Sequence, residues 1–259
     1  MNALEPILAA TRGEVERRRE ATPVEAFTPR EDTVRDFAAA LRRPGLSLIG
    51  EHKRRSPSAG AIREDLSLEE VVTAYHRGGA AALSVLTEGP NFGGSLDDLR
   101  RARLASPLPI LRKDFTVDGY QVHEALAAGA DAILLIVAAL EDAQLQALHG
   151  LASELGLAAL VEVHDEPELE RALAAGAEVI GINNRDLTTL EVELRRTFEV
   201  RARIPKGITV VAESGFSLPS QLDELEAAGV DAVLIGEALM RAPDIEASVR
   251  ALTARTMSP

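Results

Sequence analysis

Short apolar runs alternate with longer amphipathic stretches from about residue 46 onward. Val, Ile, Leu and Ala dominate these runs, a composition typical of parallel strands that helices cover on both faces. The predicted strands are residues 47–53, 81–87, 109–114, 132–138, 158–163, 179–184, 208–214 and 232–236. In the stretches between them, such as SLEEVVTAYHRGG and LPSQLDELEAAG, apolar residues recur at helical spacing. The pattern predicts eight alternating β/α units.

A short motif repeats at the junctions between these units. Each copy joins the end of a predicted helix to a glycine and then to an apolar strand, as in LAAGADAILLI and EAAGVDAVLIG. The aligned glycines are Gly79, Gly129, Gly176 and Gly229, at intervals of 50, 47 and 53 residues. Glycine at this place fits the left-handed residue that ends a helix. Two β/α units in roughly 50 residues match an eightfold barrel of about 250 residues.

We therefore predict a (β/α)8 TIM barrel that occupies residues 45–259 as a single structural domain. A doubly wound open sheet is the competing fold, and it should carry a glycine-rich dinucleotide fingerprint after its first strand. The chain has KRRSPSAG at that place, which lacks the required glycine spacing. The barrel is therefore the preferred fold.

Residues 1–44 precede the first predicted strand and show only helical periodicity. Apolar residues recur at roughly helical spacing near the start: Leu4, Ile7, Leu8 and Val15. A second amphipathic stretch runs from residue 34 to 41 around Phe37. Two helices without strands cannot enclose a core of their own, so we predict a helical extension that packs on the barrel. A lid over a functional site is the alternative.

Composition narrows the possible partners. The chain has 28 basic and 41 acidic residues, a net charge of −13, which argues against nucleic acid. Aromatic residues make up only 3%, so stacking platforms for single strands are not expected either. The absence of cysteine excludes disulfides and a thiol nucleophile, and the five histidines lack metal-ligand spacing. No apolar run reaches 18 residues and no signal peptide is evident, so we expect a cytoplasmic protein without a membrane partner.

Ionisable and amide side chains gather where the predicted strands end. The C-terminal ends of the strands form the active-site face of a TIM barrel. Five of the eight strands end in such residues: Glu51 and Lys53, Lys113, Glu162, Asn183 and Arg185, and Glu213 and Ser214. An ion-pair network without catalysis is the alternative. Buried charges cost several kcal/mol each unless they are paired, so this many in one mouth favour an active site.

Lys113 is the central candidate in this set. It lies in PILRKDFT (109–116), where strand alternation places it on the face of Leu111 and Phe115, opposite Arg112. If that face is the barrel interior, desolvation should lower the pKa of Lys113 and suit it to general acid catalysis near neutral pH. A lysine that extends from the strand end into water is the alternative interpretation.

Glycine-bearing turns follow the last two predicted strands. These turns are ESGFS (213–217) and IGEALM (235–240), and in a TIM barrel the loops at these places commonly bind phosphate through backbone N–H groups. The carboxylate of Glu237 would repel a phosphate, so we expect its N–H to bind and its side chain to turn away. His164 could reach the mouth, although its place after a strand favours a loop histidine.

The ordered motifs of the chain resemble those of the indole-3-glycerol phosphate synthase family. They are GEHKRRSPSAG, SVLTEGPNFGGS, LRKDF, LVEVHDE, IGINNRDL, VAESG and LIGEALM, and they cover residues from about 46 to 240. The resemblance implies a carboxy-lyase of tryptophan biosynthesis. Such an enzyme converts 1-(2-carboxyphenylamino)-1-deoxyribulose 5-phosphate to indole-3-glycerol phosphate, and releases carbon dioxide and water. The resemblance further implies a phosphorylated small-molecule substrate, no cofactor and no metal. It allows either a monomer or a fusion to neighbouring pathway enzymes, and we expect a monomer.

The resemblance also implies roles for the catalytic candidates. Lys113 falls on the general acid that protonates the C2′ carbonyl oxygen, and Glu162 on the general base or on the stabiliser of a cationic ring. Lys53 falls on the lysine that contacts the substrate carboxylate, and which lysine serves which step stays open. Glu51 falls on a residue that assists dehydration.

The remaining implied positions bind or orient the substrate. The orienting positions are Asn183, Glu213, Ser214 and the charge of Arg185; the apolar wall for the aromatic ring is Phe92, Phe115, Leu134 and Leu234; and the phosphate cradle is Ser56, Gly215, Gly236 and the Glu237 backbone.

Two other functions stay open at this point. Another phosphate-binding barrel enzyme, such as an Amadori-type sugar isomerase, should use a Cys–Asp or Asp–Asp pair. The chain has no cysteine and no aspartate at the end of its first predicted strand. A barrel that binds a phosphorylated metabolite without turnover is the non-enzymatic alternative. Lys113, Lys53 and Glu162 together argue against it.

Overall fold

Eight parallel strands close into a barrel in a computed structural model that describes residues 4–28, 30, 32–56, 60–63 and 65–254. Around the barrel the order is β1-β10-β9-β8-β7-β6-β5-β4. The strands are β1 (Ser47–His52), β4 (Ala82–Leu86), β5 (Ile110–Lys113), β6 (Ala132–Ile136), β7 (Ala158–Val163), β8 (Val179–Asn183), β9 (Thr209–Glu213) and β10 (Ala232–Ile235). The predicted barrel is confirmed, and each predicted strand end lies within two residues of the observed one.

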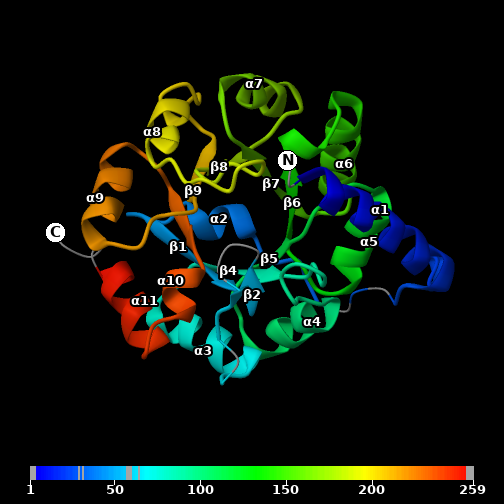
Figure 1. The fold of residues 1–259 in the computed structure, drawn as a ribbon, viewed down its shortest axis with the longest axis horizontal. Coiled ribbons are helices and arrows are strands. Elements are labelled where there is room, and N and C mark those ends of the chain that lie inside the picture. Colours follow the sequence, from blue (N-terminus) through cyan, green and yellow to red (C-terminus); the bar gives the residue numbers. More distant parts are fainter. Residues whose placement is uncertain (1–3, 29, 31, 57–59, 64, 255–259) are drawn as a thin grey trace.

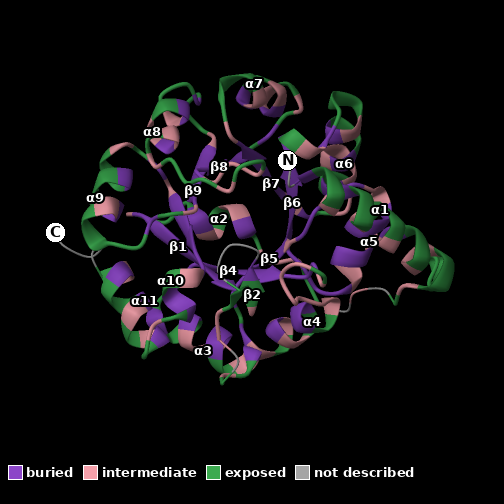
Figure 2. Cartoon of the chain, viewed as in Figure 1, coloured by how far each residue is buried: buried purple, intermediate pink, exposed green. Residues whose placement is uncertain are grey.

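A ring of helices surrounds the strands (Figure 1). The helices are α3 (Leu68–Gly78), α4 (Leu96–Ala105), α5 (Gly119–Ala127), α6 (Asp142–Glu154), α7 (Glu166–Ala174), α8 (Arg195–Arg201), α9 (Pro219–Ala227), α10 (Glu237–Met240) and α11 (Ile245–Thr253). The strands are buried, whereas the helices are buried only on the side that faces them (Figure 2). Within the described ranges no helix has the length and apolar character to cross a bilayer. Residues 255–259 of the predicted barrel domain lie outside the described residues.

Four short elements were not predicted from the hydrophobic pattern. They are the 3-10 helices η1 (Val24–Ala26) and η2 (Val137–Ala139) and the hairpin of β2 (Arg55–Ser56) with β3 (Gly60–Ala61). The end of the run predicted as strand 132–138 belongs to η2, which turns the chain toward α6. Each of these elements has only two or three residues, too few to show a period.

Local signals set the ends of the helices. At the start of α3 the Ser67 hydroxyl accepts a hydrogen bond from the Glu70 N–H, and the Glu70 carboxylate accepts one from the Ser67 N–H at 2.8 Å. This capping box satisfies donors that a helix start leaves free. The four repeated glycines have positive φ angles: Gly79 96°, Gly129 91°, Gly176 85° and Gly229 76°. The predicted left-handed ends are therefore confirmed.

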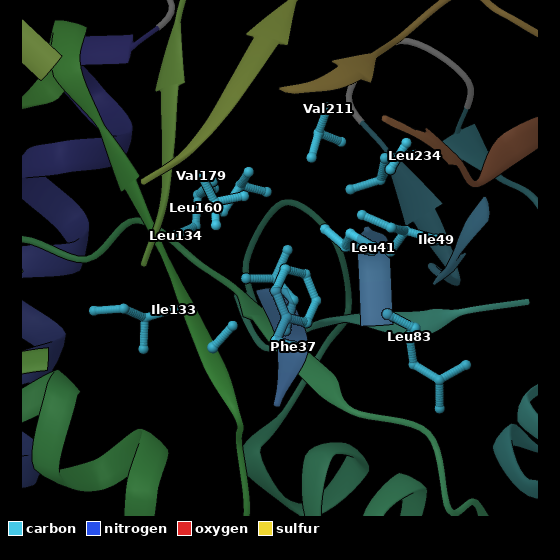
Figure 3. Close-up of a cluster of buried hydrophobic side chains, with 14 of the residues drawn as sticks. Phe37, Leu41, Ile49, Leu83, Ile133, Leu134, Leu160, Val179, Val211 and Leu234 are labelled. Atoms are coloured by element: carbon cyan, nitrogen blue, oxygen red, sulfur yellow. The ribbon is translucent and has the colours of Figure 1, made fainter. Parts of the chain in front are cut away.

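The N-terminal extension packs on two different parts of the barrel. Helix α1 (Leu4–Ala21) contacts α5, and α2 (Phe37–Leu41) contacts β1 and β4. Phe37 and Leu41 are almost fully buried and project among side chains of the barrel interior (Figure 3). Arg42 donates to Thr209 at the start of β9, so α2 lies at the N-terminal end of the strands. It closes the end opposite the predicted site and is not a lid over that site.

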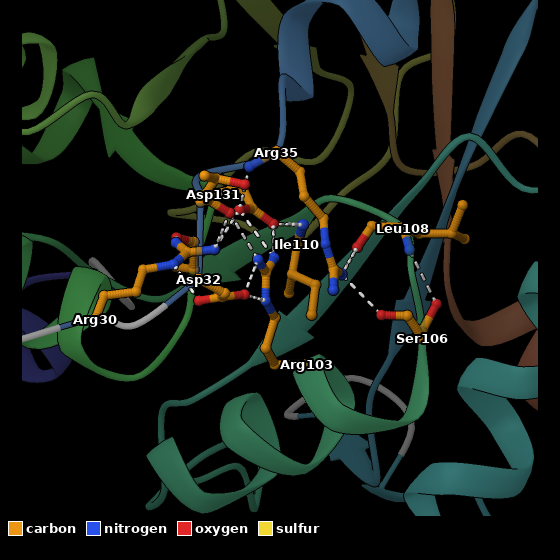
Figure 4. A network of polar contacts seen from close by, with 10 residues as sticks. Arg30, Asp32, Arg35, Arg103, Ser106, Leu108, Ile110 and Asp131 are labelled. Atoms are coloured by element: carbon orange, nitrogen blue, oxygen red, sulfur yellow. Dashed lines mark hydrogen bonds and ion pairs between the residues drawn. The ribbon is translucent and has the colours of Figure 1, made fainter.

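A buried carboxylate joins the extension to this closed end (Figure 4). Asp131 lies just before β6 and is 0% exposed. Its oxygens accept hydrogen bonds from the side chains of Arg30 and Arg103 and from the backbone N–H groups of Arg35 and Ile110, at 2.8–3.0 Å. This cluster, the Asp131 network, ties the extension to the starts of β5 and β6.

Candidate active site

A cavity of about 390 Å³ opens at the C-terminal ends of the barrel strands. It brings together every predicted site residue except Ser56: Glu51, Lys53, Phe92, Lys113, Phe115, Leu134, Glu162, Asn183, Arg185, Glu213, Ser214, Gly215, Leu234, Gly236 and Glu237. Ser56 is a buried residue of β2 and does not line the cavity. Its contribution to phosphate binding stays a prediction.

Lys113 lies at the end of β5 between carboxylates from three other strands. Its Nζ is 3.2 Å from Glu213 Oε2 on β9, 3.8 Å from Glu51 Oε2 on β1 and 3.9 Å from Glu162 Oε2 on β7. All three carboxylates are buried. The predicted orientation of Lys113 into the barrel mouth is therefore confirmed.

The predicted direction of the Lys113 pKa is wrong. Burial does act to lower this pKa, but Glu213, Glu51 and Glu162 together outweigh burial and raise it above its ordinary value. The prediction counted only desolvation, since the three carboxylates come from strands distant in sequence. Lys113 therefore stays protonated across the neutral range. Lys113 therefore carries a proton that it can donate, and its pKa depends on the charges of the neighbouring carboxylates.

Lys53 and Glu51 form a second charged pair beside Lys113. Lys53 Nζ lies 2.8 Å from Glu51 Oε1. Burial works to raise the pKa of Glu51, but the charges of Lys53 and Lys113 overcome burial and lower it. A Cβ added at Gly236 would lie 2.5 Å from Glu51 Oε1. The glycine after β10 therefore keeps space for this carboxylate.

Glu213 has the opposite electrostatic character. Burial raises its pKa to about 7, and the charge of Glu162 adds to this effect although Lys113 opposes it. A Cβ added at Gly181 of the neighbouring β8 would overlap Glu213 Oε1. Sequence reasoning missed Gly181, yet a glycine inside the apolar strand VIGIN is a signal of close approach by another group.

Arg112 supports Lys113 from the other side of β5. It is 1% exposed and forms ion pairs with Asp114 at 2.9 Å and Glu124 at 2.8 Å. Asp114 Oδ1 accepts a hydrogen bond from the Phe115 N–H at 2.9 Å. The pair Arg112–Asp114 therefore holds the turn that follows Lys113. Asp114 also lines the cavity. It was not among the predicted site residues, because it was treated only as the last residue of the predicted strand 109–114.

The ends of strands β8 and β9, and the residues directly after them, carry the polar side chains that were predicted to orient the substrate. The Arg185 N–H donates to Asn183 Oδ1 at 3.0 Å, and the Arg185 guanidinium donates to the Leu190 carbonyl at 2.9 Å. Ser214 has a φ of 63°, which is strained for a residue with a side chain, and Gly215 follows with a φ of 91°. The left-handed turn after β9 thus begins one residue before its glycine.

An ion pair lies at the predicted phosphate end of the cavity. Glu237 Oε1 accepts a hydrogen bond from Arg241 Nε at 3.0 Å, and both residues line the cavity. Sequence reasoning missed Arg241, although its place four residues after Glu237, directly after α10, is the spacing of a helical ion pair. The guanidinium offsets the carboxylate that was expected to oppose phosphate.

Apolar side chains form the rest of the lining. Phe92, Phe115, Leu134 and Leu234 were predicted, and Leu86, Ile136, Leu187, Phe216 and Ile235 were not. The unpredicted residues come from strand ends and loops whose apolar character resembles the rest of the core, so no local signal separates them from it. The cavity can therefore hold an aromatic group beside its cluster of charges.

A barrel with lysines, carboxylates and glycine-bearing turns at its C-terminal face defines the class of a TIM-barrel enzyme with acid–base chemistry. Solved structures support the fold alone. Thiamine phosphate pyrophosphorylase from Pyrococcus furiosus superposes with a TM-score of 0.63 at 19% identity, covering 84% of this chain and 100% of that one. N-acetylmannosamine-6-phosphate 2-epimerase from Clostridium perfringens gives 0.63 at 16% identity, covering 82% and 93%.

Sequence comparison narrows the class to one family. The family model for indole-3-glycerol phosphate synthase matches residues 4–252. Indole-3-glycerol phosphate synthase 2 of Streptomyces coelicolor is 53% identical over 218 residues, 84% of each chain. Indole-3-glycerol phosphate synthase of a Nocardioides species is 48% identical over 256 residues, 98% of each chain. The chain belongs to the indole-3-glycerol phosphate synthase family, which confirms the resemblance, and it is a carboxy-lyase of tryptophan biosynthesis with a phosphorylated small-molecule substrate.

Proposed function

We propose that Lys113 is the proton donor and Glu162 the proton acceptor when this chain converts 1-(2-carboxyphenylamino)-1-deoxyribulose 5-phosphate to indole-3-glycerol phosphate. One observation carries the proposal: an ammonium group whose side chain is 15% exposed faces three buried carboxylates in a cavity with an apolar wall. Ring closure followed by dehydration needs a donor and an acceptor within one site.

Ring closure comes first. The aromatic carbon that carries the carboxylate attacks the C2′ carbonyl carbon, a carbon–carbon bond forms, and the carbonyl electron pair moves to oxygen. Lys113 protonates that oxygen as its charge develops. Carbon dioxide then leaves, and the electrons of the broken bond restore the aromatic ring. Lys53, paired with Glu51, supplies a cation for the substrate carboxylate before it is lost.

Dehydration follows. The new hydroxyl group takes a proton and leaves as water, while Glu162 removes the proton from the carbon next to the ring nitrogen. Either Lys113 or Lys53 donates the second proton, with Glu51 assisting through its pair with Lys53. Two protons are donated and one is accepted, so each turnover takes one net proton from solution.

The other lining residues bind the substrate. Phe92, Phe115, Leu134 and Leu234 receive the aromatic ring; Asn183, Arg185, Glu213 and Ser214 orient the polar chain; and the backbone of Gly215, Gly236 and Glu237 binds the phosphate. Ser56 lies outside the lining and contributes to phosphate binding from β2. Backbone N–H groups at such turns favour anions. Residues of one chain line the entire cavity, so we also propose that a monomer suffices, which requires the specific activity to stay constant on dilution.

The test uses the absence of tryptophan, because indole fluorescence then reports product alone. Lys113→Ala should bind substrate in a calorimeter but lose about 10²- to 10⁴-fold in turnover, the usual contribution of a general acid. Near-normal turnover would remove Lys113 from this role. If the unaltered protein binds substrate without a fluorescence rise, the barrel is a binder; if it does neither, the isomerase alternative returns.

A further inference from the structure

A histidine outside the active-site cavity faces the proposed base. His164 directly follows β7, two residues after Glu162. Its Nε2 lies 3.7 Å from Glu162 Oε1. Both atoms are buried, and neither has a hydrogen bond with any described residue. An unsatisfied buried acceptor costs about 1–3 kcal/mol, so two that face each other at this distance call for a reason.

The other ring nitrogen fixes the orientation of the imidazole. His164 Nδ1 lies 3.0 Å from Glu168 Oε2, and the same oxygen accepts the His164 N–H at 2.7 Å. Glu168 is held in turn in the first turn of α7, where Asp165 caps its N–H. In the neutral ring this network assigns the proton to Nδ1 and turns the Nε2 lone pair toward Glu162. The arrangement is a carboxylate, an imidazole and a second carboxylate in a row.

This row leads from the active site to a second cavity. Glu162 lines the active-site cavity, whereas His164 and Glu168 line a polar cavity of about 650 Å³ between α7 and α8. These two helices lie side by side next to β7 and β8 (Figure 1). His164 therefore separates the buried base from a polar space on the outside of the barrel.

The base must lose its proton before the next turnover. Glu162 is 1% exposed, so its proton has to pass to a neighbouring group. One neighbour is Lys113, which lies 3.9 Å away and has given up a proton during ring closure, and the other is His164. Of these two, only His164 also lines the second cavity. Glu168 beyond it meets the second cavity, where a proton can reach solvent.

We propose that His164 is a positioning residue of this synthase, which orients Glu162 and takes over the proton that Glu162 removes from the reaction intermediate. The proposal rests on the proposed role of Glu162 as base. The proton on Glu162 Oε1 moves to the Nε2 lone pair, so Glu162 recovers its negative charge and the ring becomes an imidazolium. The imidazolium then loses its Nδ1 proton through Glu168 to the second cavity, which leaves a neutral ring with its proton on Nε2. Tautomer exchange, in which Nδ1 regains a proton from the second cavity and Nε2 gives one up, restores the starting ring.

The charges around His164 predict how this relay depends on pH. Burial and Arg196 on α8 disfavour the imidazolium, whereas Glu168 and Glu162 favour it and raise the pKa of His164 above its ordinary value. Asp186 in the loop after β8 faces the same cavity. Only the neutral ring can accept a proton, so the relay should be blocked as pH falls below the pKa of His164.

The steady-state rate of indole formation tests the relay, because Glu162 has to lose its proton between turnovers. His164→Ala should slow this rate about 10- to 100-fold, the lower part of the range for acid–base groups. Substrate affinity should change little because His164 does not line the active-site cavity. Added imidazole can enter through the second cavity and should restore the rate at least about threefold, in proportion to its neutral form. Histidine that acted only as packing would show no such rescue.

Two further variants keep the proposal testable. His164→Gln, which retains a polar side chain, should lack the fall in rate at acidic pH that the relay predicts for the unaltered protein. His149→Ala removes a half-buried histidine of α6 far from Glu162 and should keep both the rate and its pH profile. If His164→Ala fails to fold, the pH profile of His164→Gln decides.

Different results test the proposed relay through His164 and the proposed role of Glu162 as base. The relay is overturned if His164→Ala keeps the full rate, if imidazole gives no rescue, or if His164→Gln keeps the acidic limb. Glu162→Gln must still be nearly inactive in those cases for the proposed function to stand. If Glu162→Gln turns over normally, the base assignment fails, and the relay fails with it.

Discussion

The two ends of the barrel both bury charge, but they satisfy it in different ways. At the closed end, both oxygens of Asp131 are bonded by arginine side chains and backbone N–H groups. At the open end, Glu213 Oε1 and Glu162 Oε1 lack a hydrogen bond to any residue in the described part of the chain, and Glu213 Oε2 has the Lys113 ion pair at 3.2 Å. The carboxylate oxygens at the closed end therefore all accept hydrogen bonds, and we call this a saturated network. Some carboxylate oxygens at the open end accept none, and we call this an open network.

This difference separates stability from chemistry. A saturated buried network loses stability when one member is removed, since its partners become uncompensated. An open network already carries the cost of its unsatisfied acceptors, so replacing a member can leave the fold intact while activity disappears. Strained Ser214 lies at the open end as well. Variants at the two ends should therefore fail in opposite ways.

Asp131→Ala should give the largest loss of stability. Arg30 and Arg103 are nearly buried and would lose their fully buried partner, at a cost of about 3–5 kcal/mol in the free energy of unfolding. Urea unfolding followed by circular dichroism measures this loss. Turnover at low temperature should stay within about twofold, because the Asp131 network lies at the far end of the barrel.

Asp32→Ala is the matched control for this experiment. Asp32 pairs with the same two arginines but its side chain is 50% exposed, so its loss should cost less than about 1 kcal/mol. Equal losses for Asp131→Ala and Asp32→Ala, or an unaltered unfolding curve for Asp131→Ala, would contradict the view that the closed end is built for stability.

Glu213→Gln should change how stability depends on pH. The pKa of Glu213 is raised to about 7 in the folded protein by burial, against about 4.3 in the unfolded chain. At pH values between these two pKa values, the folded state therefore binds one more proton than the unfolded chain does. The stability that comes from this proton on Glu213 is fully present below about pH 4 and is lost as the pH rises through about 7. The variant should lack this loss, so it gains stability relative to the unaltered protein between pH 5 and 8.

Unfolding free energies of both proteins at several pH values measure this difference. Glu51→Gln serves as the control, because the pKa of Glu51 is lowered by Lys53 and Lys113 and its contribution changes only at more acidic pH, with the opposite sign. Parallel pH curves for Glu213→Gln and the unaltered protein would show that Glu213 stays ionised in the fold.

Local patterns were enough to predict the barrel and most of its site. Apolar runs and the repeated glycines located all eight strands, and the fold places the end of every strand on one face. The rule that strand ends carry the site then selected the cavity residues without any contact information. Ser56 shows the limit of this rule, because it lies in β2, a hairpin strand too short to predict.

What the sequence could not predict depends on contacts between distant strands. The pKa of Lys113 was predicted with the wrong sign because its three carboxylates come from β1, β7 and β9. Helix α2 was predicted, yet no local signal showed which end of the barrel it closes. His164 lies in the loop after β7, as predicted, but its distance to Glu162 could not be predicted because it depends on how the chain bends there.

The smallest expected effect concerns Arg241, at the predicted phosphate end of the open cavity. Its guanidinium is half exposed and already paired with Glu237. Arg241→Met should therefore raise KM only about two- to fivefold, equivalent to the 1 kcal/mol or less that exposed charges contribute, and should leave kcat unchanged.

Glu237→Gln removes the opposing carboxylate and should lower KM slightly, so the two variants shift KM in opposite directions. Because surface charges are screened, added salt should diminish both shifts. A fall in kcat for Arg241→Met would instead place Arg241 among the groups that act in the transition state.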